Sequence, residues 1–304
     1  MSARTRERIS GVILIDKELD VSSNLAVQIL RRVMNAAKAG HTGTLDPKAT
    51  GLLPMALGEA TKYAGGFIDA DKTYEAEIVL GVRTSTDDTE GEVLEVRPAA
   101  FALEELAPAL EAFRGEIDQV PPMHSAIKRS GEKLYEIARR GGSVALAPRR
   151  VRIDELEILA WEPPRLALRV SCSKGTYIRA LARDIGEKLG CGAHLSALRR
   201  TRVGRFRIED AITLKGLEAL GMPERRARLM PCDAFLEGMP RLDFPARDAS
   251  RLLNGQRMNV RGTPEGTYRL YAGEAFLGTG RVSAAGTLSP AKMVSAPEGA
   301  TMND

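Results

Sequence analysis

Alternation of apolar and polar side chains limits the fold of this chain more than any other feature of its sequence. KTYEAEIVLGV (residues 72–82) and RLALRVSCS (residues 165–173) place an apolar side chain at every second position. A period of two is that of a β-strand with one buried face. GVILIDK (residues 11–17) is instead a short continuous apolar run with β-branched residues, which is typical of a buried strand. We therefore expect strands at these three places.

Helical periodicity lies between these strands. LAVQILRRVMNAAKAG (residues 25–40) and TYIRALARDIGEKLG (residues 176–190) carry apolar residues three and four positions apart, as on one face of a helix. Ser22 or Ser23 can cap the first helix, and Gly40 suits its end. Arg179 falls in the first turn of the second helix, where the helix dipole disfavours a cation. Its position therefore suggests a specific anionic partner.

The composition excludes several classes of protein. The 304 residues are 43% hydrophobic and 28% charged, which is ordinary for a globular protein. The net charge of +4 and the pI of about 9.0 point weakly to a polyanion such as nucleic acid. Neither a P-loop, a Rossmann glycine pattern nor a G-x-S-x-G elbow occurs.

The cysteines and histidines predict neither a disulfide framework nor a metal site. The three cysteines are odd in number and far apart, without a C-x-x-C pair, and the three histidines are scattered. The segment MSARTRERIS lacks the apolar core of a secretory signal. No apolar run approaches the roughly 18 residues of a membrane helix, so we expect a cytoplasmic protein.

The stretch GHTGTLDPKATGLLP (residues 40–54) is too irregular for a regular helix or strand and is interpreted as a shaped loop. Pro47 keeps Asp46 out of the helical region, and the neighbouring threonines and backbone N–H groups can orient its carboxylate. An aspartate before proline is more often a turn former or cap than a nucleophile. A second carboxylate could come from Asp87 or Asp88, but the sequence does not place them near Asp46.

Two basic segments are candidates for contacting a polyanion. Residues 122–150 are basic, with paired glycines, and are interpreted either as an insertion or mobile arm that meets a polyanion or as a solvated surface excursion. ALRRTRVGRFRIED (residues 197–210) holds five arginines in nine positions. That run suits phosphate contacts, with a charged strand edge as the alternative. After a Pro/Gly-rich stretch near 238–245, short glycine-broken strands predict a small β-rich domain.

Several segments together resemble the TruB family of tRNA pseudouridine synthases. They are GHTGTLDPKATGLLPMALGEATK, KTYEAEIVLGVRTSTDDTEGE, QVPPMHSAIKRSGEKLYEIARRG and SKGTYIRALARDIGEKLGCGAHLSALRRTRVGRF, in the family's order. The C-terminal β-rich segment is similar to the PUA domain of bacterial members. The resemblance covers most of the chain.

The resemblance implies an α+β fold: a mixed, largely antiparallel sheet with flanking helices and a central cleft, plus a small C-terminal β-barrel of PUA type. We expect a catalytic domain over residues 1–240, with the insertion at about 122–150, and an RNA-binding domain over residues 241–304. The implied reaction isomerises uridine-55 in the T-arm of tRNA to pseudouridine, without cofactor or metal. We expect a monomer that needs no protein partner and no membrane.

The resemblance also implies roles for single residues. Asp46 acts as the nucleophile or as a base at the sugar, with Arg179 as its partner, and Tyr74 stacks on the target base. The pocket residues are His41, which helps to open the RNA loop, with Lys17, Tyr177 and Leu198. The expected RNA contacts are Lys128, Arg129, Arg139, Arg140, Arg199, Arg200 and Arg202.

One departure from the family pattern stands at residues 16–24. The family's motif is near D-K-P-x-G-x-T-S, whereas this chain has DKELDVSSN, with Glu18 for proline, Asp20 for glycine and Ser22 for threonine. This change bears on the rigidity of the turn and touches none of the expected catalytic residues. An RNA-binding or RNA-folding protein without catalysis remains the alternative of a different class.

Overall fold

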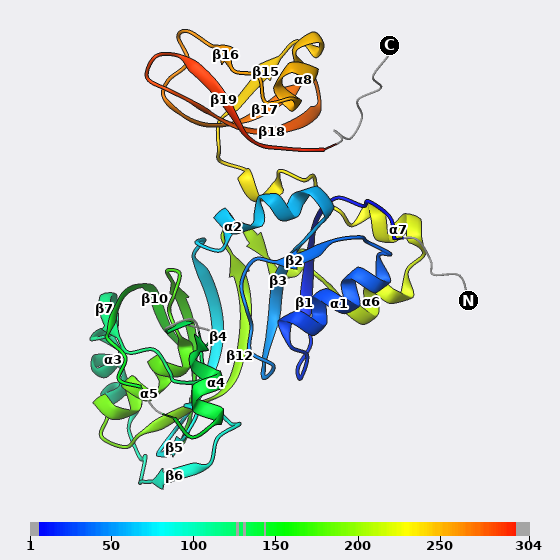
Figure 1. The fold of residues 1–304 in the computed structure, drawn as a ribbon. Helices are drawn as coiled ribbons and strands as arrows, with labels where there is room; N and C mark the ends of the chain where they lie inside the picture. Colours follow the sequence, from blue (N-terminus) through cyan, green and yellow to red (C-terminus); the bar gives the residue numbers. More distant parts are fainter. Residues whose placement is uncertain (1–5, 126–127, 130–131, 143, 296–304) are drawn as a thin grey trace.

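Two sheets organise the computed structural model, which describes residues 6–125, 128–129, 132–142 and 144–295 (Figure 1). The larger sheet comprises β1 (Gly11–Lys17), β2 (Ala39–His41), β3 (Ala49–Leu57), β4 (Lys72–Leu80), β7 (Gly115–Gln119), β10 (Arg149–Glu162), β11 (Arg165–Cys172), β12 (Ala193–Val203), β13 (Phe206–Arg207) and β14 (Ile212–Thr213). Its main strand order is β14-β1-β3-β12-β4-β11-β10-β7, while β2 pairs with β3 and β13 with β12. Among the strand pairs described within this larger sheet, β1/β14 and β3/β12 are parallel and the others are antiparallel.

The smaller sheet follows in the chain. It comprises β15 (Arg241–Phe244), β16 (Met258–Asn259), β17 (Gly266–Ala272), β18 (Ala275–Val282) and β19 (Thr287–Met293), in the order β15-β17-β18-β19-β16. Two hairpins complete the strands: β5 (Val82–Thr84) with β6 (Val93–Val96), and β8 (Lys128–Arg129) with β9 (Glu132–Lys133).

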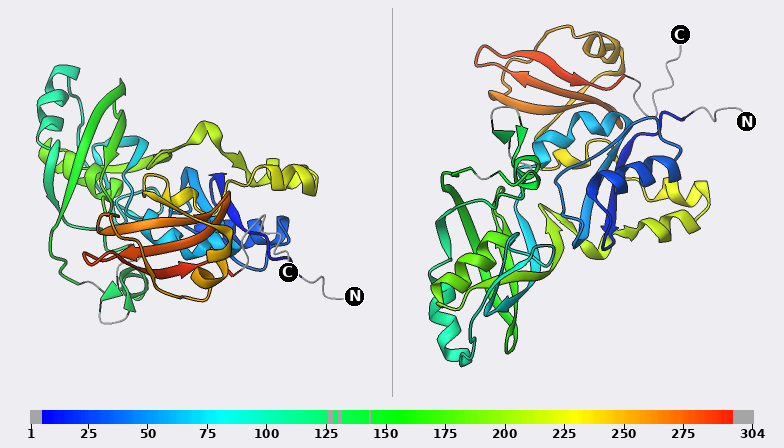
Figure 2. Two further views of the ribbon diagram at one scale, coloured as in Figure 1. Left: turned by 90° about the horizontal axis from the view of Figure 1, so that it is seen from above. Right: turned by 60° about the horizontal axis from the view of Figure 1, so that its bottom comes forward.

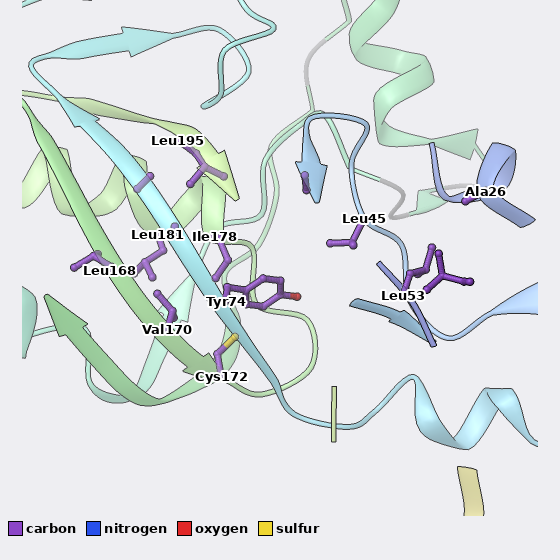
Figure 3. Packing of buried hydrophobic residues seen from close by; sticks show 14 of the residues in the cluster. Ala26, Leu45, Leu53, Tyr74, Leu168, Val170, Cys172, Ile178, Leu181 and Leu195 are labelled. Atoms are coloured by element: carbon purple, nitrogen blue, oxygen red, sulfur yellow. The ribbon is translucent and has the colours of Figure 1, made fainter. Parts of the chain in front are cut away.

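Helices flank both sheets. The α-helices are α1 (Ser23–Val33), α2 (Ala64–Phe67), α3 (Leu103–Glu111), α4 (Leu134–Arg139), α5 (Ile178–Lys188), α6 (Leu214–Ala219), α7 (Met222–Ala227) and α8 (Ala246–Leu253), of which α8 packs against the smaller sheet. Leu30 of α1, Leu106 of α3, Leu181 of α5 and Leu217 of α6 belong to one buried cluster with the strands. Figure 3 shows part of this cluster, in which side chains from β4, β11, β12 and α5 pack together.

The opposite side of the larger sheet packs toward the smaller one. Val12, Leu52 and Phe206 form a second buried cluster, against which Phe276 of β18 also packs. The Tyr63 and Phe276 rings lie 5.3 Å apart, and the buried Asp233 carboxylate pairs with Arg269 of β17 at 2.7 Å. In Figures 1 and 2 the orange-to-red smaller sheet therefore lies beyond α2, at the end of the larger sheet away from α3 and β7.

The expected α+β fold is confirmed: a mixed, largely antiparallel sheet with flanking helices is followed by a small C-terminal sheet. The domain boundary between residues 240 and 241 stays a prediction. Within the described chain, no helix has the length and apolar character needed to cross a membrane.

Two expected elements differ from the structure. The first helix stops at Val33 rather than near Gly40, because Asn35 adopts a left-handed φ of 52° and the following residues form β2. The expected loop over residues 40–54 is a loop only over residues 42–48, because residues 40 and 41 belong to β2. Ala49–Leu57 is instead the almost wholly buried strand β3, because its apolar run fills the sheet.

Candidate active site

Asp46 lies in the tight loop between β2 and β3. The Ser23 hydroxyl of α1 accepts from the backbone N–H of Leu45 and donates to its carbonyl, both at 2.9 Å. The Asp46 carbonyl accepts from the N–H of Ala49 at 3.0 Å, which closes the turn at the start of β3. The loop is thus held from both sides, while the Asp46 side chain remains 44% exposed. A carboxylate in this position is held on a rigid backbone and remains accessible from the solvent.

Arg179 is the ion-pair partner of Asp46. Its side chain is only 7% exposed, and its Nη2 lies 2.9 Å from the Asp46 Oδ2. The guanidinium also donates to the carbonyls of His124 at 2.8 Å and Thr86 at 3.3 Å. The anionic partner expected for a cation in the first turn of α5 is therefore Asp46. A guanidinium held at several points fixes the orientation of the carboxylate that it contacts.

Asp88 is the third charged group at this place. Its Oδ2 lies 3.4 Å from the Nη1 of Arg179, so Asp46 and Asp88 approach the same guanidinium through different nitrogens. The neighbouring Asp87 instead pairs with Arg183 at 3.1 Å. Sequence reasoning named both aspartates without placing them. A D-D pair in a polar turn gives no sign of which carboxylate faces inward, because that depends on contacts with a distant helix.

Tyr74 lies on β4, 8% exposed, within the main apolar cluster. In the sheet it stands between Val170 of β11 and Arg200 of β12. Figure 3 shows its ring emerging from the apolar side chains with the hydroxyl directed toward the loop that carries Leu45. Burial raises the pKa of this hydroxyl, and the charge and hydrogen bond of Arg200 oppose that rise. A tyrosine so placed packs its ring while keeping its polar end toward the loop of Asp46.

Lys17 ends β1 fully buried, beneath the Asp46 loop. Its ammonium donates to the carbonyls of Val21 at 2.7 Å, Glu18 at 3.0 Å and Pro47 at 3.4 Å. Burial lowers the pKa of this lysine to about 8, although the Asp46 charge acts in the opposite direction. Lys17 thus fastens the turn at 18–21 to the residue that follows Asp46.

The turn DKELDVSSN, which departs from the family motif, keeps its shape through Asp20. This residue adopts a left-handed φ of 61°, which a glycine enters freely and an aspartate tolerates. Its backbone N–H donates to the Pro47 carbonyl at 2.9 Å, and its carboxylate pairs with Lys48 at 2.7 Å. The turn therefore supports the Asp46 loop in spite of the substituted residues.

The remaining expected pocket residues lie on neighbouring elements. His41 ends β2 and accepts at Nδ1 from the Gly43 N–H at 3.2 Å, and burial together with Arg200 lowers the pKa of its ring. Tyr177 precedes α5, where its backbone N–H and carbonyl both bond the Gln119 side chain, at 2.9 and 3.1 Å. Leu198 of β12 lies between Ala49 of β3 and Ala76 of β4.

The arginine run on β12 does not form one exposed strip. Arg199 makes two bonds to the Asp16 carboxylate, at 3.1 and 2.8 Å, and Arg202 donates to the Thr73 hydroxyl at 3.1 Å. Arg200 is only 2% exposed, so a contact with RNA phosphates, which stays a prediction, would require this side chain to leave its buried position. Side chains alternate across a strand, and β12 lies between β3 and β4. Because β12 has a neighbouring strand on each side, the alternative of a charged strand edge is wrong.

The expected contacts in the insertion are only partly described. Arg140 is exposed and forms an ion pair with Glu132. The side chains of Lys128, Arg129 and Arg139 lie outside the described residues. Across the described segments, no group of three or more histidine, cysteine or acidic side chains is arranged to hold a metal ion, and the buried Cys172, Cys191 and Cys232 form no disulfide with one another.

Three family models match successive parts of the chain. The model described as "TruB family pseudouridylate synthase (N terminal domain)" matches residues 31–178. "tRNA pseudouridylate synthase B C-terminal domain" matches residues 179–237, and "Pseudouridine synthase II TruB, C-terminal" matches residues 240–294.

Curated relatives are similar over nearly the whole length. The tRNA pseudouridine synthase B of Aromatoleum aromaticum is 49% identical over 290 residues, which cover 95% of this chain and 94% of that protein. The protein of the same name from Azoarcus sp. is 47% identical, with 97% and 98% covered. The one from Ralstonia nicotianae is 54% identical over 257 residues, with 83% and 82% covered.

Solved structures share the fold. A chain from an H/ACA RNP bound to a substrate RNA containing 2'-deoxyuridine aligns with a TM-score of 0.71 and 25% identity, covering 94% of this chain and 85% of its own. A chain from a Cbf5-Nop10-Gar1 complex aligns with the same TM-score and 27% identity, covering 94% and 84%.

Proposed function

This chain belongs to the TruB family and is a tRNA pseudouridine synthase, and from that premise we propose its substrate nucleotide and its catalytic groups. The proposed target is uridine-55 in the T-arm of tRNA, which the enzyme isomerises to pseudouridine. Asp46 is the proposed nucleophile, with Arg179 and Tyr74 as its partners. The 2.9 Å contact between Asp46 and Arg179 is the observation that supports this assignment most.

The reaction exchanges one bond of the uridine for another. The bond between N1 of the base and C1′ of the ribose breaks, and a bond from C5 to C1′ forms. C5 loses its proton, and N1 gains one. Attack of the carboxylate on the base, its attack on the ribose and a glycal route are all compatible with this balance. Each requires an ionised and oriented carboxylate, and the contact with Arg179 and the closed loop around Asp46 support its orientation.

The target uridine has to leave the RNA loop to reach Asp46, so we propose that the enzyme extrudes it. Tyr74 lies beside the loop of Asp46 with its hydroxyl directed toward that loop, and we propose that its ring stacks on the base. His41 precedes the same loop and would help to hold the RNA loop open. Lys17, Tyr177 and Leu198 would shape the pocket around these groups.

The grip on tRNA is proposed to come from phosphates and from RNA shape. The exposed Arg140, Arg199 with its partly exposed guanidinium, and the side chains of Lys128, Arg129 and Arg139 are the proposed contacts. Arg202 would contribute from its site beside Thr73. The smaller C-terminal sheet would bind the acceptor side of the tRNA. We further propose a cytoplasmic monomer without an obligate protein partner.

Mapping of pseudouridine in tRNA tests the proposal directly. Unmodified tRNA transcript is incubated with the purified protein, and pseudouridine is located by carbodiimide modification and primer extension. We expect one new pseudouridine at position 55, and none in a transcript in which cytidine replaces that uridine. Pseudouridine at another position would overturn the assigned nucleotide. Binding without any pseudouridine would favour an RNA-binding protein without catalysis, and release of free uracil would indicate a hydrolase.

A further inference from the structure

Arg200 is a buried cation in the centre of the larger sheet. It lies on β12 directly beside Tyr74 of β4 on one side and Gly51 of β3 on the other. Its Nε donates to the Leu52 carbonyl at 2.8 Å, and its Nη2 donates to the Gly43 carbonyl at 3.2 Å. The guanidinium acts electrostatically on the hydroxyl of Tyr74, whose pKa it lowers against the effect of burial. The side chain thus joins the loop of Asp46 to strand β3, next to the tyrosine.

The charge of Arg200 is not matched by a carboxylate. Over the described residues, its side chain forms no ion pair, whereas Arg179 pairs with both Asp46 and Asp88. A buried cation without an anion is costly, and such groups collect at functional sites. The charge acts on its surroundings, because it lowers the pKa values of Lys17 and His41 in addition to the effect of burial.

Arginine can only donate hydrogen bonds, so the neighbouring Arg200 can act on the hydroxyl of Tyr74 only as a donor to its oxygen. Such a bond leaves the hydroxyl's own hydrogen to point elsewhere. Apolar side chains surround the ring on the cluster side, and the hydroxyl faces the loop that precedes Asp46 (Figure 3). The hydrogen would then be directed toward the side of the tyrosine on which the target base would lie.

We propose that Arg200 is a positioning residue for Tyr74: its guanidinium donates to the tyrosine oxygen, holds the tyrosine as a proton donor toward the base and balances the negative charge left on the oxygen. This inference rests on the proposed function. In the isomerisation the hydroxyl of Tyr74 gives its proton to N1 as the N1–C1′ bond breaks. The tyrosinate then takes the proton from C5 after the C5–C1′ bond has formed, so the tyrosine ends unchanged. Arg200 keeps its charge throughout and touches neither the base nor the ribose.

A double-mutant cycle tests whether Arg200 acts through Tyr74. Single-turnover rates on a T-arm stem-loop are measured for the full-length wild type, Arg200→Gln, Tyr74→Phe and the double variant, with RNA affinity measured in parallel. We expect Arg200→Gln to lower the rate about 100-fold, the order of a proton-transfer contribution, with RNA affinity within about threefold. In the Tyr74→Phe background the same change should cost less than about threefold. Arg165→Gln, at an exposed arginine of β11, is the matched control and should leave both quantities unchanged.

Two results would overturn the inference. One is an equal loss of rate from Arg200→Gln in both backgrounds, because Arg200 would then act independently of Tyr74. The other is weakened RNA binding with an unchanged rate, because Arg200 would then serve as an RNA contact. If Arg200→Gln does not fold, the cycle is run with Arg200→Lys, which keeps the charge, and the same two outcomes decide.

A readout without RNA separates this inference from the proposed function. Fluorotyrosine placed at position 74 reports on the hydroxyl through its fluorine resonance. We expect this resonance to move in Arg200→Gln and to stay in place in Arg165→Gln, and an unmoved resonance in both would overturn the pairing. Absence of pseudouridine with the wild type would instead overturn the proposed function and leave the fluorine result standing.

Discussion

Asp46 and Arg179 meet at 2.9 Å although they belong to a loop before β3 and to the first turn of α5. The arginine is almost fully buried and the aspartate is half-exposed, so the cation is fixed and the carboxylate faces outward. This asymmetry orients the carboxylate without hiding it from a substrate. It also distinguishes this contact from a surface ion pair, in which both partners are mobile and solvated.

Asp46→Asn should abolish turnover while leaving RNA bound. The amide is nearly the same size as the carboxylate but is neither a nucleophile nor a base. We expect the single-turnover rate to fall by about 10³-fold or more, the order found when a catalytic nucleophile is removed. Affinity for the stem-loop should stay within about threefold, and Asp69→Asn, at an exposed aspartate that pairs with Lys174, is the control. Persistent turnover would show that Asp46 is not the essential group.

Arg179→Lys should be far from conservative. A lysine cannot present separate nitrogens to Asp46 and Asp88 while also reaching the His124 carbonyl. We expect a loss of about 100-fold in the single-turnover rate, again with little change in RNA affinity. Asp88→Asn should reduce the rate in the same direction but less, because it removes one of several holds on the guanidinium. A rate for Asp88→Asn equal to that of the wild type would contradict the positioning role of this carboxylate.

Lys17 should make stability depend on pH in an unusual direction. Its pKa falls from 10.5 in the unfolded chain to about 8 in the folded protein, so between these values the unfolded chain binds more protons. Its contribution to the free energy of unfolding therefore rises with pH from about 8 to 10.5, by at most about 1.4 kcal/mol per pH unit. Below about pH 8 the buried charge lowers stability by a constant amount. Denaturant unfolding of the wild type and Lys17→Met across this range measures the difference, and equal slopes would contradict it.

Asp20 offers a test of how the turn at residues 16–24 keeps its shape although it departs from the family motif. Asp20→Gly should fold and isomerise uridine as the wild type does, because glycine adopts the left-handed φ of 61° without strain. Asp20→Ala should be less stable than Asp20→Gly by about 1 kcal/mol, since it keeps the strain and removes the aspartate. Thermal unfolding of the two variants checks the order. A more stable alanine variant would show that the left-handed backbone is not what selects the residue here.

Asp233 should control how firmly the smaller sheet is held. It is buried, pairs with Arg269 at 2.7 Å and accepts from the Tyr271 hydroxyl. Asp233→Ala removes the carboxylate partner of the partly exposed Arg269 guanidinium and of the Tyr271 hydroxyl, so we expect a loss of about 2 kcal/mol in the free energy of unfolding. Limited proteolysis should also cut faster near Gly238 in this variant. Asp243→Asn, at an exposed aspartate of β15, is the control, and equal cleavage of both variants would contradict the role of Asp233.

Local pattern was enough to predict most elements of this chain. Period-two alternation predicted β4 and β11, and helical spacing predicted α5, because each pattern shows which side chains of an element face the core. Local pattern was less reliable where pairing with another segment decided the secondary structure. The residues after Met34 continue a helical composition, yet Asn35 turns the chain and β2 pairs with β3. The apolar half of residues 40–54 likewise becomes strand β3, because it pairs with β1 and β12 in the larger sheet.

The sequence by itself determined the family, the expected reaction and the residue types of the site, because these rest on motifs that are contiguous in the chain. Only the tertiary structure decided which charged groups face one another. It placed Asp88 rather than Asp87 against Arg179, and it turned Arg200 inward to Tyr74 instead of outward. Neighbouring residues in a strand or turn point in opposite directions. Which direction is buried depends on the elements that pack against them, and those elements come from distant parts of the chain.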